Sequence, residues 1–112
     1  MKTKMISIDD FKKCVIRIGT VLSAEVVPDA DKLLKLSIDV GEENPRQIIS
    51  GIRGFVAGPE YLVGKQMPVL INLEPRTIRG LESQGMILAA SSEGEFSLLF
   101  PEKKIKDGAE IR

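Results

Sequence analysis

Alternation of apolar and polar residues dominates the first half of the chain and predicts β-strands, in which successive side chains point to opposite faces. The clearest stretch covers residues 34–40, where every second position is apolar: Leu34, Leu36, Ile38 and Val40. Residues 16–26 show the same period, and we expect one buried face to carry Ile16, Ile18, Leu22, Ala24 and Val26. Gly19 interrupts this strand, which favours a β-bulge or a bend at that point.

Four shorter apolar segments predict further strands, at residues 46–52, 66–73, 86–91 and 96–101. Turn-forming sequences such as PDAD at 28–31 and GEENP at 41–45 separate the first three strands. In the second half, residues 74–85 form the longest polar connection. A short helix is expected to begin after Ser7, which precedes Asp10 by three residues, and a single helical turn is expected at residues 59–63.

Five or more short strands, with one helical turn between the third and the fourth, predict an all-β fold. The layout is that of a five-stranded oligonucleotide/oligosaccharide-binding (OB) barrel, with a short N-terminal helix and C-terminal extension strands. A β-sandwich of similar length fits the pattern as well. With 112 residues the chain has the size of one domain. We place that domain at residues 8–112 and treat residues 1–7 as an N-terminal extension.

The composition argues against several classes of chemistry. The chain has no histidine and a single cysteine, Cys14, so it lacks the ligands for a Cys/His zinc site and the base of a Ser–His or Cys–His relay. We therefore expect no enzyme activity, metal or other cofactor. Cys14 opens an apolar stretch and is expected to pack in the core. The lone thiol and the absence of a long apolar run favour a cytoplasmic protein with no membrane contact.

Charge is balanced overall, with 16 basic and 16 acidic residues, but its distribution is uneven. Residues 44–90 carry five basic and three acidic residues. An OB barrel binds its ligand across strands two and three, between the loop joining strands one and two and the loop joining strands four and five. On our strand assignment, four cations fall in this region: Lys32, Lys35, Arg76 and Arg79. Ammonium and guanidinium groups there suit phosphate oxygens.

Aromatic residues do not fall on the same face. Phe11, Phe55, Tyr61, Phe96 and Phe100 all lie outside the outward positions of strands two and three. Proteins that bind single strands use exposed rings there as stacking platforms for bases. The sequence therefore favours recognition of a folded RNA by its shape and backbone.

Several motifs occur in an order that resembles the structure-specific tRNA-binding domain family. They are PDADKL at 28–33, RQIISGI at 46–52, VGK at 63–65 and LEPRTIRGLESQGMILAAS at 73–91. This family includes free-standing bacterial tRNA-binding proteins and the C-terminal domain of methionyl-tRNA synthetase. The resemblance implies an OB barrel that grips the outer corner of folded tRNA without reading its sequence. It also implies a homodimer.

The resemblance assigns tRNA binding to six residues at matching motif positions: Lys32, Arg79, Ser83, Gln84, Gly85 and Met86. Ser83 and Gln84 can hydrogen-bond sugar or phosphate oxygens, and Gly85 would let the RNA approach closely. Met86 has a second interpretation, as a core residue that begins a strand.

These observations lead to two functional hypotheses. The first is a non-catalytic, homodimeric tRNA-binding protein that acts alone or serves an aminoacyl-tRNA synthetase such as the methionyl enzyme. The second is a protein-interaction module, similar to a secretion chaperone or to a handle that oligomerises a synthetase. The apolar run FSLLFP at 96–101 motivates the second hypothesis. The intact ESQGM at 82–86 favours the first, since the related chaperones lack a clean copy of it.

Overall fold

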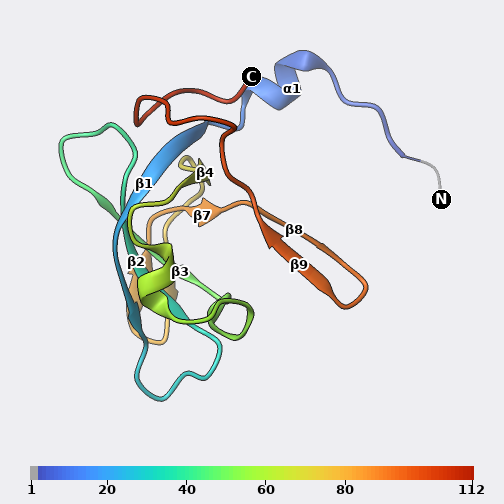
Figure 1. The fold of residues 1–112 in the computed structure, drawn as a ribbon. Helices are drawn as coiled ribbons and strands as arrows, with labels where there is room; N and C mark the ends of the chain where they lie inside the picture. The colour runs from blue at the N-terminus through green and yellow to red at the C-terminus, as the bar shows by residue number, and fades with distance from the viewer. Residues whose placement is uncertain (1–2) are drawn as a thin grey trace.

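The computed structural model describes residues 3–112, so residues 1–2 of the expected N-terminal extension lie outside the described part. Five strands form an antiparallel sheet in the spatial order β3-β2-β1-β4-β7 (Figure 1). They are β1 (Ile16–Val26), β2 (Leu34–Asp39), β3 (Arg46–Ser50), β4 (Gln66–Leu70) and β7 (Met86–Ile87). The sheet curls until its edge strands β3 and β7 come into contact. This nearly closed five-stranded barrel confirms the expected OB-type fold.

A β-hairpin made of β5 (Arg76–Ile78) and β6 (Leu81–Ser83) lies beside the barrel, with β6 against β3. The polar connection expected over residues 74–85 does join β4 to β7, but it contains this hairpin, which the sequence did not predict. Two residues form the turn, Arg79 with φ 53° and Gly80 with φ 78°. Positive φ at both central residues defines the tight turn that suits the twist of a hairpin. An arginine is unusual at its first position, which explains why the sequence did not reveal the hairpin.

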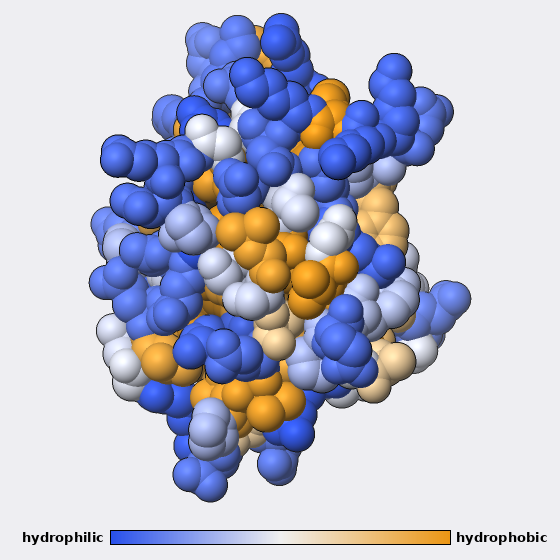
Figure 2. Space-filling view, turned by 60° about the vertical axis from the view of Figure 1, so that its left-hand side comes forward, coloured by the Kyte–Doolittle hydropathy of each residue, from blue (hydrophilic) through white to orange (hydrophobic). Residues whose placement is uncertain are grey.

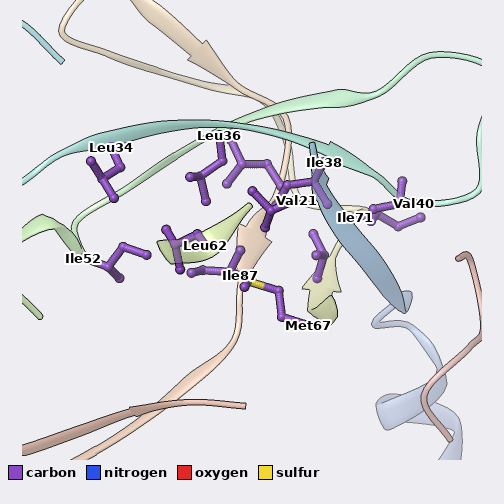
Figure 3. Close-up of a cluster of buried hydrophobic side chains, with 12 residues drawn as sticks. Val21, Leu34, Leu36, Ile38, Val40, Ile52, Leu62, Met67, Ile71 and Ile87 are labelled. Atoms are coloured by element: carbon purple, nitrogen blue, oxygen red, sulfur yellow. The ribbon is translucent and has the colours of Figure 1, made fainter. Parts of the chain in front are cut away.

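The core lies inside the barrel and confirms the alternation seen in β2. Leu34, Leu36, Ile38 and Val40 are fully buried. They pack with residues from the other strands and from the segment between β3 and β4 (Figure 3). That segment contains two 3-10 helices, η1 (Arg53–Phe55) and η2 (Pro59–Leu62), and Leu62 of η2 is fully buried. The helical turn expected at residues 59–63 thus closes one end of the core.

Strand β1 differs from its prediction because a bulge shifts its register between Val21 and Ser23. Val21 pairs with the buried Ile38 and is itself fully buried, whereas Leu22 is 48% exposed. The expected buried face is therefore wrong at Leu22 and also at Val26, which is 43% exposed. The face that Figure 2 presents, with the β1–β2 side brought forward, shows apolar patches separated by charged and polar side chains.

Gly19 allows close packing of two strands. The β-bulge predicted at Gly19 lies instead between Val21 and Ser23. Gly19 pairs with the buried Met67, so both residues face the interior. A Cβ atom at Gly19 would lie 2.7 Å from Ile38 Cγ2 and 2.9 Å from the Asp39 carbonyl oxygen. Strands β1 and β2 can approach this closely only because residue 19 has no side chain.

Helix α1 and the C-terminal tail both lie near the first residues of β1 (Figure 1). Helix α1 (Ile8–Lys12) begins as expected, with the Ser7 Oγ accepting a hydrogen bond from the Asp10 N–H at 3.0 Å. The C-terminal tail covers Ile18, whose N–H donates to the Ala109 carbonyl. Cys14 is exposed, so the expectation of a core thiol was wrong.

The strands expected in the last third form an arm outside the barrel. Strands β8 (Ala89–Ser92) and β9 (Glu95–Leu98) pair with each other and project from the barrel (Figure 1). They are the expected C-terminal extension strands. Among residues 3–112, no helix has the length and apolar character needed to span a bilayer.

Substitution of Gly19 by alanine should destabilise the protein by about 1–3 kcal/mol, because the added methyl group overpacks the β1–β2 contact. Gly54→Ala is the matched control, since a Cβ at Gly54 would meet no atom within 4 Å. Urea unfolding of both variants measures the difference. Equal stability of the two variants would contradict the packing role of Gly19.

Candidate nucleic-acid interface

The outer face of strands β2 and β3 carries a groove of about 320 Å³. Its lining comes from three neighbouring strands and the segment after β6, and includes Ser23, Lys35, Ser37, Gln47 and Gln84. Lys35 points outward, opposite the buried Leu34 and Leu36, as predicted. Its Nζ lies 3.9 Å from Glu25 Oε2, and both side chains are partly exposed. Such a loose surface pair is weak, so a phosphate can compete for the ammonium group.

Lys32 is exposed in the loop between β1 and β2. Two contacts from Arg53 hold this loop in place. The Arg53 N–H donates to the Lys32 carbonyl at 3.2 Å, and its Nη1 donates to the Ala30 carbonyl at 3.3 Å. Asp29 has φ 61°, a left-handed conformation that aspartate tolerates better than most residues. The backbone that carries Lys32 is therefore fixed by the fold.

The β5–β6 hairpin brings Arg79 to the same end of this face as Lys32. Gln84 lies beside Gln47, and Ser83 beside Ile49, so β6 runs antiparallel to β3. The hairpin turn therefore lies toward the Ser50 end of β3. Ser50 pairs with Leu34, which follows Lys32 by two residues. The structure thus groups the exposed Lys32 and Arg79 at one end of the barrel. Arg76, also exposed, pairs with Ser83 at the other end of the hairpin.

Ser83 has a role inside the fold that differs from its expected contact with RNA. Its side chain is buried, with 6% exposed. The hydroxyl accepts a hydrogen bond from the Ile49 N–H at 3.0 Å and donates to the Gly85 carbonyl at 3.1 Å. Ser83 therefore joins the hairpin to β3, and its hydroxyl is occupied by these contacts.

Gly85 likewise has a structural reason for its identity. Its φ is 153°, and a Cβ atom at this position would lie 2.9 Å from the Leu70 carbonyl oxygen. The missing side chain lets the segment between β6 and β7 approach β4. Close approach of the protein's own backbone thus explains the glycine, in place of the expected close approach of RNA.

Gln84 makes hydrogen bonds within the fold and also lines the groove. Its backbone N–H donates to the Gln47 carbonyl at 2.8 Å, and its Oε1 accepts from the Gln47 N–H at 2.9 Å. Among the described residues, its Nε2 has no hydrogen-bond partner, and the side chain lines the groove. This amide can donate to a ligand.

Met86 is 43% exposed at the start of β7, where it pairs with Leu70. The interpretation of Met86 as a core residue is therefore wrong. Its side chain is available at the surface beside the segment that contains Gln84.

Three residues that support the site were not selected from the sequence: Arg46, Gln47 and Arg53. The Arg46 Nη1 donates to the carbonyls of Ile71 and Gln84 at 2.7 and 2.8 Å. Gln47 also donates from its Nε2 to the Glu82 carbonyl. Their side chains bond backbone carbonyls far away in the sequence, which leaves no local signal in the residue pattern.

Arg46 is itself held by Glu42. The guanidinium Nε donates to Glu42 Oε1 at 2.7 Å. This hydrogen bond lowers the pKa of the Glu42 carboxyl and raises the pKa of Arg46. The ion pair therefore stabilises the protein at neutral pH, and this contribution is lost in acid as the pH falls through the lowered pKa of Glu42.

No metal site accompanies these residues. Across residues 3–112, Cys, Asp and Glu side chains do not gather in a group of three or more that could hold an ion. The polar groups that line the groove are the ammonium group of Lys35, amides and hydroxyls, together with the carboxylate of Glu25.

An OB barrel with cations on this face is a nucleic-acid-binding architecture, and sequence comparison identifies which one. Residues 16–110 match the family described as "Putative tRNA binding domain". Since the match covers most of the chain, the protein belongs to this family.

Individual relatives agree with this assignment. Methionine–tRNA ligase of Methanoregula boonei is 53% identical over 111 residues, which are 99% of this chain and 16% of the ligase. The chain therefore corresponds to a small part of that enzyme.

Solved structures with two different descriptions share the fold. The MetRS-related protein from Pyrococcus horikoshii superposes with a TM-score of 0.91 at 32% identity, covering 98% of this chain and all of that one. The chaperone CsaA from Bacillus anthracis superposes with a TM-score of 0.85 at 31% identity, covering 97% of this chain and all of the chaperone. Both solved chains share the fold over their full length.

Substitution of Ser83 by alanine should lower the free energy of unfolding by about 1–3 kcal/mol, because the buried Ile49 N–H loses its acceptor. Ser97→Ala is the control, since the exposed Ser97 hydroxyl bonds only the neighbouring Leu98 carbonyl. Urea titration gives the stabilities. If the Ser83 variant kept its stability but bound RNA poorly, the internal role would be contradicted. The expected direct contact between Ser83 and RNA would then be favoured.

Proposed function

We propose that this protein binds folded tRNA without catalysing a reaction. The observation that carries the proposal is the grouping of Lys32 and Arg79 at one end of the β2–β3 face, in a chain that belongs to a tRNA-binding family. The match of the chain to only 16% of a methionine–tRNA ligase supports a binding role separate from aminoacylation.

Phosphate contacts supply most of the affinity in this mechanism. Lys32, Lys35, Arg76 and Arg79 neutralise phosphates along the face, and each contact releases counterions. The Nε2 of Gln84 adds a hydrogen bond to the backbone, and Met86 adds an apolar contact beside it. Ser83 and Gly85 act indirectly, by holding the hairpin and the following segment against the barrel. None of these groups is arranged to read base edges, so the ligand is selected by the shape of its backbone, at the outer corner of the tRNA.

We further propose that the functional unit is residues 8–112 in a homodimer that works in the cytoplasm, alone or beside an aminoacyl-tRNA synthetase. The segment that leads into α1 supports the dimer, because Met5, Ile6 and Ile8 are 92%, 68% and 65% exposed. Apolar side chains gathered this openly favour contact with another surface. A second copy would cover them and place two cationic faces in one particle.

A protein-interaction role is the second candidate. The structural likeness to chaperone CsaA favours it, as do Leu99 and Phe100, which are 40% and 48% exposed beyond β9. Under this hypothesis the arm, and not the cationic face, would bind the partner.

Removal of single cations tests the tRNA proposal. Lys32→Ala and Arg79→Asn should each weaken binding of every tRNA species by roughly tenfold, the loss of one charge-assisted contact of ~1.5 kcal/mol. Asparagine replaces Arg79 because asparagine adopts a positive φ readily, so the conformation of the hairpin turn is preserved. Each variant should also reduce the dependence of log K on log salt by about one. Lys12→Ala, which removes the same charge from α1, is the control.

Fluorescence titration of bulk tRNA through a salt series, in folded and heat-unfolded form, provides the measurement. We expect tighter binding of the folded form. A loss confined to one tRNA species would refute shape recognition. Binding of neither form would favour the protein-interaction role.

Sedimentation equilibrium tests the dimer. We expect twice the mass of the 12.3 kDa chain at micromolar concentration. Ile6→Asp should produce a monomer with an unchanged circular-dichroism spectrum, because Ile6 is exposed and contributes little to the barrel core. Thr3→Asp is the control, since it also adds one negative charge at an exposed position of the same segment. A wild-type monomer would exclude the dimer, and a dimeric Ile6→Asp variant would exclude this interface.

A further inference from the structure

The aromatic residues that are missing from the β2–β3 face gather in a second groove. It lies between the η1–η2 segment and the β8–β9 arm and has a volume of about 290 Å³. Four of the residues that line it carry rings: Phe55, Tyr61, Phe96 and Phe100. These residues come from separate parts of the sequence, so the residue pattern gave no indication that they meet.

Two of the rings form an ordered stack. The centroids of Phe55 and Phe96 are 4.4 Å apart, and their planes differ by 15°. Phe96 is half-buried and packs against the core, whereas Phe55 is 62% exposed. The inner ring is therefore anchored, and the outer ring presents its free face to solvent. A third flat ring can extend this stack without rearrangement of the protein.

A cation accompanies the rings. Lys65 Nζ lies 4.4 Å from the ring centroid of Tyr61 and 5.6 Å from that of Phe100. Phe100 also borders an adjoining groove, which contains Lys65, Lys103 and Lys104 together with Glu102 and Asp107. Rings and ammonium groups side by side match the two parts of a nucleotide, a flat base and a phosphate.

The ring groove is also connected to the loop that carries Lys32. Phe55 follows Arg53 by two residues, and Arg53 bonds the carbonyls of Lys32 and Ala30. Two residues span at most roughly 7 Å of backbone. The backbone of Phe55 therefore lies near the loop that carries Lys32, and one RNA strand could contact both.

We infer that the ring groove binds one unpaired nucleotide of RNA, with its base stacked on Phe55 and a phosphate beside Lys65. This inference rests on the proposed tRNA-binding function and adds to it a contact that does not depend on counterion release. Because Phe55, Tyr61 and Phe100 are each about half exposed or more, the groove is shallow. A shallow groove suits a flat base better than the bulky apolar side chains of a peptide.

The test uses the full chain with two probes, folded bulk tRNA and a short single-stranded RNA that carries one 2-aminopurine. Stacking on Phe55 should quench the 2-aminopurine fluorescence. Phe55→Ala should abolish the quenching and weaken tRNA binding by roughly 5- to 100-fold, the range measured for loss of one stacked base. The salt dependence of binding should not change. Leu99→Ala is the matched control, since Leu99 is 40% exposed in the same region but does not line the groove.

Lys32→Ala distinguishes failure of this inference from failure of the proposed function. If Phe55→Ala binds tRNA like the wild type while Lys32→Ala binds weakly, the nucleotide site is wrong and the cationic face stands. If the wild-type protein binds neither probe, both proposals fail. If Phe55→Ala instead converts a dimer to a monomer in sedimentation, the groove is an interface between copies and the nucleotide site is refuted. Competition of an apolar peptide for the groove, without quenching by RNA, would also overturn it.

Discussion

The seam of hydrogen bonds between β3 and residues 83–84 is the interaction on which the rest of the structure depends. Ile49 donates to the Ser83 hydroxyl, and Gln47 and Gln84 exchange hydrogen bonds. The seam closes the barrel over its core, and the same bonds fix the direction of the β5–β6 hairpin. Because that direction carries Arg79 to the Lys32 end, one set of contacts determines both the stability of the fold and the layout of its cations.

Alternation in the sequence correctly predicted β2, its three buried residues and the buried Val40 that follows it, because an antiparallel strand with one solvent-exposed face must alternate. It failed in β1, where the bulge at Leu22 moves later residues to the other face, and a bulge leaves no mark on composition. The hairpin of residues 76–83 was missed because Arg79 occupies a turn position where asparagine or glycine is the usual signal. Exposed cations could be placed from the barrel layout, whereas the internal role of Ser83 required knowledge of what surrounds it.

The protein has no net charge, yet its proposed mechanism is electrostatic. These facts are compatible because a phosphate near the surface responds to cations within about a Debye length, roughly 8–10 Å, and not to the whole chain. Most acidic residues lie elsewhere in the chain and balance the total, although Glu25 lies beside Lys35 on the face itself. The ring groove would extend this logic, since an apolar contact retains its strength at salt concentrations that screen Lys32 and Arg79.

Arg79 illustrates a conflict between two demands on one residue. Its left-handed backbone costs a non-glycine residue about 1–2 kcal/mol, and asparagine or glycine would relieve much of that strain. Under the proposed mechanism, however, the guanidinium must lie at the tip of the turn, where it can reach the RNA. Selection for a more stable barrel and selection for RNA affinity therefore act in opposite directions at this position. A laboratory search for thermostable variants would be expected to replace Arg79 early and to lose binding as it does so.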